Sequence, residues 1–114
     1  MTPALDGAYS DMKELLQNNE PIASCYFADN DLIAAGAVKA FKEAGYRVPE
    51  DIAVVGFDDM PICTYFDPPL TTVRVPKQYM SLMAVSRLHE RIRSADHQPI
   101  KIEISTMLQK RGSC

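Results

Sequence analysis

The chain has 114 residues, of which 46% are hydrophobic and 24% charged, as expected for one globular domain or part of one. A formal net charge of −3, with no run of basic residues, argues against a nucleic-acid-binding surface. The chain shows neither a signal-peptide pattern nor an apolar run long enough to cross a membrane, so we expect a cytoplasmic protein without a membrane partner.

The N-terminal part of the chain predicts a helix, a strand and a second helix. Thr2 and Pro3 are typical of a helix start, and apolar side chains then recur at helical spacing as far as Leu16. Residues 22–28, IASCYFA, are apolar and rich in strand formers, which predicts a buried strand. The second helix is expected over residues 30–44.

Local signals indicate both ends of this second helix. Asp29 or Asn30 can cap its start, because a side-chain oxygen there accepts a hydrogen bond from the first turn. Gly45 suits the position after its last turn, where the backbone often becomes left-handed. Small side chains over residues 34–37 keep the helix thin, which permits close packing on a neighbouring element.

The rest of the chain continues the alternation of strands and helices. Strands are predicted at residues 52–57 and 70–75, with an irregular turn and a short helical piece between them. Pro76 opens a long helix to about Arg93, and residues 100–105, IKIEIS, alternate apolar and polar like a half-exposed strand. Such alternation predicts an α/β fold with a parallel sheet flanked by helices.

The three cysteines do not suggest a disulfide framework, because none lies close to another in the sequence. Cys25 and Cys63 lie in apolar surroundings and are expected to be small core residues. Cys114 is terminal, and we expect a loose thiol there.

Polar clusters follow two of the predicted strands. Asp29, Asn30 and Asp31 follow the first strand, and Asp58 and Asp59 follow the second. Ligands of such sheets bind beyond the carboxyl ends of the strands, so both clusters are expected at one rim.

Three interpretations of this rim are open. A Mg²⁺-dependent phosphoryl-transfer enzyme would use the carboxylates of Asp29, Asp31, Asp58 and Asp59, although no glycine-rich phosphate loop accompanies them. A binding site would use Asn30, which donates and accepts hydrogen bonds, and Asp58, which only accepts. Capping or solvation is the structural alternative, which we favour for Asp29, Asp31 and Asp59 taken singly.

Three segments together resemble the lactose-repressor (LacI/GalR) family of bacterial transcription regulators. They are FADNDLIAAGAVKAFKEAGYRVPEDIAVVGFDD, then PPLTTVRVP, then a terminal RGS, and the similarity runs over about residues 7–113. The resemblance implies part of a type I periplasmic-binding-protein fold, with two three-layer αβα lobes around an effector cleft. Residues 1–74 and 107–114 would belong mostly to the C-terminal lobe, and residues 75–106 would supply a helix and a strand of the N-terminal lobe.

The resemblance also implies a function. The chain would be the C-terminal fragment of a ligand-sensing and dimerisation module that binds a small polar effector, such as a sugar, without catalytic residues, metal or cofactor. Asn30 and Asp58 match positions that contact effector in the family. The helix from about Asp31 and the segment 60–67 match dimerisation surfaces of a homodimer, and DNA would be bound only through a helix-turn-helix domain absent from this chain. The side chains expected at the dimer interface are Leu32, Ala35, Lys39, Met60, Ile62, Tyr65 and Phe66.

A periplasmic sugar-binding protein is the alternative within the same fold. Such proteins share the ND…VGFD pattern, but they usually lack PPLTTVR and the terminal RGS, and they carry signal peptides. In either case the helix over residues 76–93 and the strand over residues 100–105 would lack most of their own lobe. We therefore expect the isolated chain either to dimerise, for example by exchanging its C-terminal segment, or to have low stability.

Overall fold

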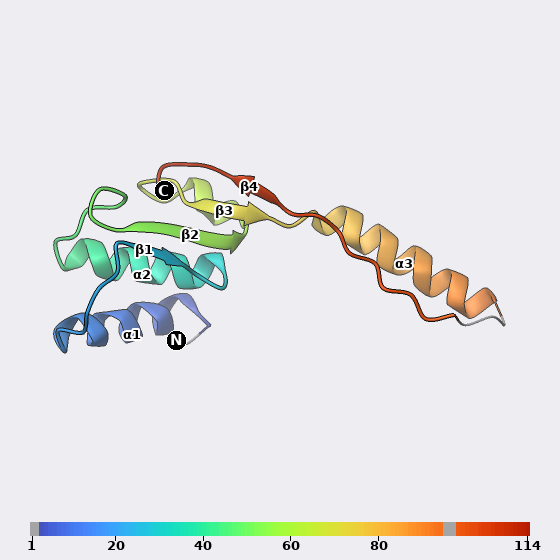
Figure 1. Ribbon diagram of the computed structural model, residues 1–114, viewed down its shortest axis with the longest axis horizontal. Helices are drawn as coiled ribbons and strands as arrows, with labels where there is room; N and C mark the ends of the chain where they lie inside the picture. The colour runs from blue at the N-terminus through green and yellow to red at the C-terminus, as the bar shows by residue number, and fades with distance from the viewer. Residues whose placement is uncertain (1–2, 95–97) are drawn as a thin grey trace. The chain divides into compact units, whose positions relative to one another are not determined.

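A computed structural model describes residues 3–94 and 98–114, which divide into two compact units. Unit 1 extends as far as Arg74 and includes Met107–Cys114, whereas unit 2 is Val75–Thr106. The elements in chain order are α1 (Leu5–Gln17), β1 (Cys25–Phe27), α2 (Asp31–Glu43), β2 (Ala53–Asp58), the 3₁₀ helix η1 (Pro61–Thr64), β3 (Thr71–Arg74), α3 (Lys77–Arg93) and β4 (Met107–Gln109), as Figure 1 shows.

The sheet of unit 1 is mostly parallel, with the strand order β1-β2-β3-β4. β1 and β3 both run parallel to β2, and Phe27 lies opposite Val55 in the β1–β2 pair. The short β4 runs antiparallel to β3, with Met107 opposite Arg74. The predicted α/β class, with a parallel sheet flanked by helices, is therefore confirmed.

The ends of α2 follow from its sequence. The side chain of Asn30, and not that of Asp29, caps the helix, since Asn30 Oδ1 accepts a 2.8 Å hydrogen bond from the N–H of Ile33. Gly45 follows the helix with a φ of 92°, a left-handed conformation that glycine adopts without steric cost.

The core of unit 1 lies between α2, α1 and one face of the sheet. α2 is stacked between α1 and the sheet (Figure 1). A side chain at Gly36 would come within 2.5 Å of the backbone oxygen of Leu5, so glycine there permits the close approach of the two helices. The largest fully buried apolar side chains of this core are Phe41, Ile52, Leu70 and Val54.

The opposite face of the sheet is less covered, and one expectation about it was wrong. β1 is an edge strand of only three residues, with Cys25 exposed and Phe27 64% exposed, rather than a buried strand over residues 22–28. Cys25 therefore is not a core residue, whereas Cys63 is fully buried as predicted. Phe27 packs edge-on against Phe57 of β2, with ring centroids 6.4 Å apart.

Unit 2 contains α3 but not the strand that the alternating pattern predicts at residues 100–105. Ile100 and Ile102 are exposed there, and β4 forms instead at Met107–Gln109, where β3 offers free backbone groups. Alternation alone does not make a strand without a neighbour to pair with. Residues 95–97 of the predicted polar loop lie outside the described residues.

α3 buries none of its side chains, so its apolar stripe is open. The stripe consists of side chains that are 61–74% exposed: Leu82, Val85, Leu88 and Ile92.

In the part of the chain that the structure describes, no helix combines the length and the apolar character that crossing a bilayer requires.

Candidate functional site

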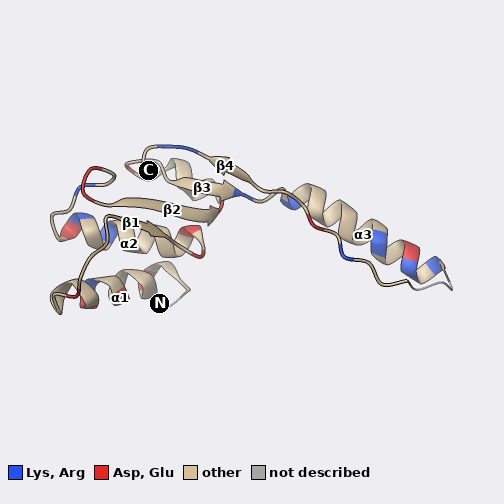
Figure 2. Cartoon of the chain, in the orientation of Figure 1, with Lys and Arg blue, Asp and Glu red and all other residues tan. Residues whose placement is uncertain are grey.

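The carboxyl ends of β1 and β2 place polar residues at one edge of the sheet. Because the strands are neighbours and parallel, the segment after Phe27 and the last residue of β2, Asp58, lie at the same edge. Figure 2 shows acidic residues at the start of α2 and at the end of β2, with the basic end of β3 next to them. The expected convergence of the two clusters on one side of the sheet therefore agrees with the strand order.

Asn30 has one polar atom engaged in the fold. Its Oδ1 caps α2 through the N–H of Ile33, and the side chain is half-buried. This cap does not use the two N–H donors of the side-chain amide. Capping and ligand binding can therefore coexist at Asn30, because the two roles need different atoms.

Asp58 lies in an unusual backbone conformation at the end of β2. Its φ is 114° and that of Asp59 is 53°, so two successive non-glycine residues have positive φ. Such conformations cost about 1–3 kcal/mol each and concentrate at functional sites, and aspartate tolerates them better than most residues. The half-buried Asp58 is thereby turned out of the regular strand geometry.

Asp31 is a structural residue rather than a solvated one. Its carboxylate is fully buried, and it accepts hydrogen bonds from Thr72 Oγ1 at 2.6 Å and from the N–H of Met60 at 2.7 Å. A methyl group at Gly56 would overlap Asp31 Oδ1, so glycine in β2 makes room for this carboxylate. The predicted solvated or capping role of Asp31 is replaced by one that joins α2, β3 and the turn after β2.

The buried carboxylate of Asp31 also affects Cys63 of η1. Burial, together with the hydrogen bond and the negative charge of Asp31, raises the pKa of the Cys63 thiol to about 12. A thiol with this pKa is not a nucleophile near neutral pH. Cys63 is therefore an unreactive thiol buried in the core.

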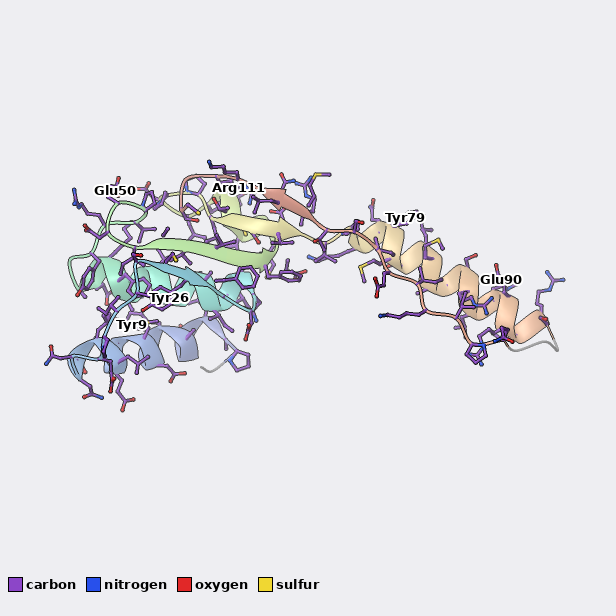
Figure 3. The ribbon with its side chains drawn as sticks, in the orientation of Figure 1. Tyr9, Tyr26, Glu50, Tyr79, Glu90 and Arg111 are labelled. Carbon is purple, nitrogen blue, oxygen red and sulfur yellow. The ribbon has the colours of Figure 1, made fainter. Side chains whose placement is uncertain are left out.

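Asp59 is held between two arginines. Asp59 Oδ2 accepts from Arg74 Nε at 2.7 Å and Asp59 Oδ1 accepts from Arg111 Nη2 at 2.8 Å, while the Asp59 side chain is only 8% exposed. Arg111 lies alongside β3 (Figure 3), and its backbone N–H donates to Thr71 Oγ1 at 2.8 Å. Burial opposes ionisation of Asp59, but the two arginine hydrogen bonds outweigh it, so its pKa lies below the ordinary value.

These contacts show which acids of the rim are structural. Both oxygens of Asp31 and both of Asp59 are occupied by protein donors, and Asp29 is exposed. Within residues 3–94 and 98–114, no group of three or more His, Cys, Asp or Glu side chains could hold a metal ion. Of the predicted binding site, Asn30 comes shortly after β1, and Asp58 is the last residue of the neighbouring strand β2.

Sequence reasoning missed the partners of Asp31 and Asp59. Thr72 lies 41 residues after Asp31, and Arg111 lies 52 residues after Asp59. Spacings of this length carry no periodic signal. The one available hint was that the segments with Thr72 and Arg111 belong to the motifs that carry the family resemblance.

The surface expected to form a dimer is partly open. Tyr65 is 84% exposed and Lys39 is exposed, whereas Ala35 is only 5% exposed and contributes to the core of unit 1. Tyr65 and Lys39 line a groove of about 340 Å³ together with Val38 and Phe66. The other expected interface residues, Leu32, Met60 and Ile62, are half-buried.

The sequence pattern described as "Periplasmic binding protein-like domain" matches residues 2–114, nearly the whole chain. The chain belongs to this family. The resemblance to LacI-type regulators is confirmed.

Relatives in the periplasmic binding protein-like family include named repressors. The chain is 39% identical to the "HTH-type transcriptional repressor PurR" of Aliivibrio fischeri (strain ATCC 700601 / ES114), over 85% of this chain and 28% of that protein. It is 34% identical to the "Ribose operon repressor" of Escherichia coli (strain K12), over 95% of this chain and 32% of that protein. The chain therefore spans about a third of the length of these relatives.

Two of the similar solved structures are described with a bound sugar. The "transcriptional regulator CelR-cellobiose complex" matches with a TM-score of 0.88 and 33% identity, over 97% of this chain and 34% of that one. A LacI family regulator from Enterococcus faecium with bound ribose matches with a TM-score of 0.83 and 30% identity, over 97% of this chain and 40% of that one.

Proposed function

We propose that this chain is the part of a transcription regulator that senses a small polar effector, a sugar or a related metabolite. Asn30 and Asp58 contact the effector, Asn30 through its amide donors and Asp58 through its carboxylate. The sensing module acts as a homodimer in the cytoplasm and controls DNA binding by a part of the regulator other than these residues. The sugar class is supported by the cellobiose and ribose bound to two similar regulators.

One observation carries this proposal. Of the acids at the carboxyl edge of the sheet, Asp31 and Asp59 are each committed to the scaffold by two hydrogen bonds, and Asp58 lies half-buried at the same edge as the last residue of β2. Asp58 has a strained backbone with φ at 114°, and Asn30 follows the neighbouring strand. Hydroxyl groups of a sugar both donate and accept, which matches a carboxylate beside an amide.

The enzymatic alternative loses support from the same contacts. A Mg²⁺ site made of the four rim aspartates would have to take oxygens from Asp31 and Asp59 that already accept 2.6–2.8 Å hydrogen bonds. Breaking such bonds at buried carboxylates costs free energy that metal binding would have to recover. The relatives are named as repressors, which also favours a regulator over an enzyme or a periplasmic carrier.

A homodimer is the second part of the proposal. The groove lined by Val38, Tyr65 and Phe66 provides an apolar surface with an exposed aromatic ring. Tyrosine is enriched among residues that dominate interface energies, because it buries a large area with few rotatable bonds. A partner subunit at this groove would cover Tyr65.

Calorimetry tests the binding function. The chain is titrated with a panel of monosaccharides and disaccharides and, separately, with Mg²⁺, and Asn30→Asp and Asp58→Asn serve as site variants. Asn30→Asp keeps the oxygen that caps α2, and asparagine tolerates the positive φ at position 58, so both variants should fold. Saturable sugar binding that both variants weaken supports the proposal, whereas Mg²⁺ binding at micromolar concentration without sugar binding would favour the enzyme.

A further inference from the structure

We propose that Asp59 is a positioning residue that locks both segments through which the chain passes between its two units. The functional role of this lock rests on the proposed function, because Asp59 would connect the end of β2, which carries Asp58, to both crossing points. The lock itself depends only on contacts within unit 1. An effector that moves Asp58 would then act on the crossings through the next residue of the chain.

The two crossing points lie side by side in unit 1. The chain leaves unit 1 after Arg74, the last residue of β3, and returns at Met107, the first residue of β4. Arg74 and Met107 are opposite each other in the antiparallel β3–β4 pair. A side chain that binds both the end of β3 and the segment after β4 therefore holds both crossing points together.

Asp59 meets this requirement with one oxygen for each segment. Arg74 Nε donates to Oδ2 at 2.7 Å, and Arg111, two residues after β4, donates from Nη2 to Oδ1 at 2.8 Å. Arg111 is itself fixed, since its Nη1 donates to the backbone oxygen of Leu70 at 3.0 Å. The carboxylate thus connects the outgoing and the returning segment across the edge of the sheet.

The backbone of Asp59 is hydrogen-bonded as well as its side chain. Its N–H donates to Thr72 Oγ1 at 3.3 Å, and Thr72 in turn donates to the buried carboxylate of Asp31. This series of hydrogen bonds connects the first turn of α2 to the turn after β2. Asp58 therefore precedes a residue whose backbone and side chain are both hydrogen-bonded to unit 1.

Burial makes the Asp59–Arg111 pair different from an ordinary surface pair, whereas the Arg74 side chain is 53% exposed. The Asp59 side chain is 8% exposed and that of Arg111 is 19% exposed, so water screens their interaction less than at the surface. By contrast, the pair between Arg47 and Asp51 is 72% and 35% exposed, lies within one turn and touches neither crossing. It is a matched control, because its loss also removes one carboxylate and two arginine side-chain hydrogen bonds, together with one from the backbone N–H of Arg47.

Amide hydrogen exchange of the 114-residue chain, without any effector, tests the lock. Asp59→Asn removes the charge but not the shape, and Asp51→Asn is the control. We expect Asp59→Asn to accelerate exchange of the amides of β3 and β4 by about tenfold or more relative to those of β1 and β2. Asp51→Asn should leave the ratio between these two groups of amides unchanged. Equal acceleration in all four strands, or unchanged exchange in β3 and β4, would overturn the lock.

The Arg74→Gln variant provides a second measurement if Asp59→Asn fails to fold. Arg74→Gln removes one partner and leaves Arg111 in place. Carbon NMR should then show a higher pKa for the Asp59 carboxyl, with faster exchange in the β3–β4 pair. An unchanged pKa would contradict the inference. Because neither measurement uses an effector, failure of sugar binding in calorimetry would defeat the proposed function without touching this result.

Discussion

The hydroxyl of Thr72 donates a 2.6 Å hydrogen bond to the buried carboxylate of Asp31, which connects the third strand of the sheet to the first turn of α2. The same hydroxyl accepts from the N–H of Asp59 at 3.3 Å. One side chain of β3 therefore links two acids of the rim that the sequence presents as equivalent. This link explains why Asp31 and Asp59 belong to the scaffold.

Replacing Thr72 tests this link. Thr72→Val keeps the shape but leaves Asp31 Oδ1 and the N–H of Asp59 without this partner, so it should lower the free energy of unfolding by about 1–3 kcal/mol. Thr72→Ser keeps the hydroxyl and should lose less than about 1 kcal/mol. Urea denaturation measures both, and equal stability of the two variants would contradict the structural role of the hydroxyl.

Thiol reactivity tests the environment of Cys63. With a pKa of about 12 this thiol should be almost entirely protonated near pH 8, whereas Cys25 and Cys114 are exposed. A thiol reagent should therefore label two of the three cysteines quickly and the third only when the chain unfolds. A Cys25→Ser/Cys114→Ser variant isolates the slow site. Rapid labelling of that variant in its folded state would be inconsistent with the buried Asp31–Cys63 pair.

The pKa of Asp59 predicts a pH dependence of stability. Its folded-state pKa lies below the ordinary value of 3.8, so the folded chain holds this proton less tightly than the unfolded chain does. The stabilisation is therefore complete above the unfolded-state value and is lost as the pH falls through the folded-state pKa. The stability difference between wild type and Asp59→Asn should be largest near about pH 7 and shrink below about pH 4. A difference that stays constant in urea titrations at both pH values would show that the charge does not stabilise the fold.

Two exposed tyrosines distinguish the possible modes of self-association. Tyr65 lies at the groove proposed for the homodimer, whereas Tyr79 is 56% exposed on α3 in unit 2. If the groove forms the dimer, Tyr65→Ser should weaken the dimer by about 30-fold and Tyr79→Ser should not. Sedimentation equilibrium measures both variants. The reverse result would place self-association on α3, as expected for exchange of the C-terminal segment. A wild-type monomer with a cooperative melt would contradict both modes.

The helices and strands whose ends are marked by local sequence signals could be predicted from the sequence. The oxygen of Asn30 and the position of Gly45 define α2 within the sequence itself, and the apolar run before Asp58 defines β2. The rest depends on tertiary pairing. β4 forms where β3 lies beside it, and Cys25 is exposed because it lies on the less covered face of the sheet, neither of which can be read from neighbouring residues.

The candidate site was predictable to a similar extent. The positions of Asn30 and Asp58 follow from counting residues after each strand, since neighbouring parallel strands end at the same edge. The division of the acids into scaffold and candidate ligand residues was not predictable. It depends on Arg111 and Thr72, which are distant in sequence and are brought to the rim only by the folded sheet.

The most direct test of effector sensing is an NMR titration of the isotopically labelled chain with the sugar panel, since NMR detects weak as well as tight binding. We expect one sugar to shift the side-chain amide signals of Asn30 and the backbone amide signals of Asp58 and Asp59 together, with one saturation curve, and we expect Asp58→Asn to abolish these shifts. A sugar that shifts only residues elsewhere, or a full panel that shifts none of these signals, would contradict it.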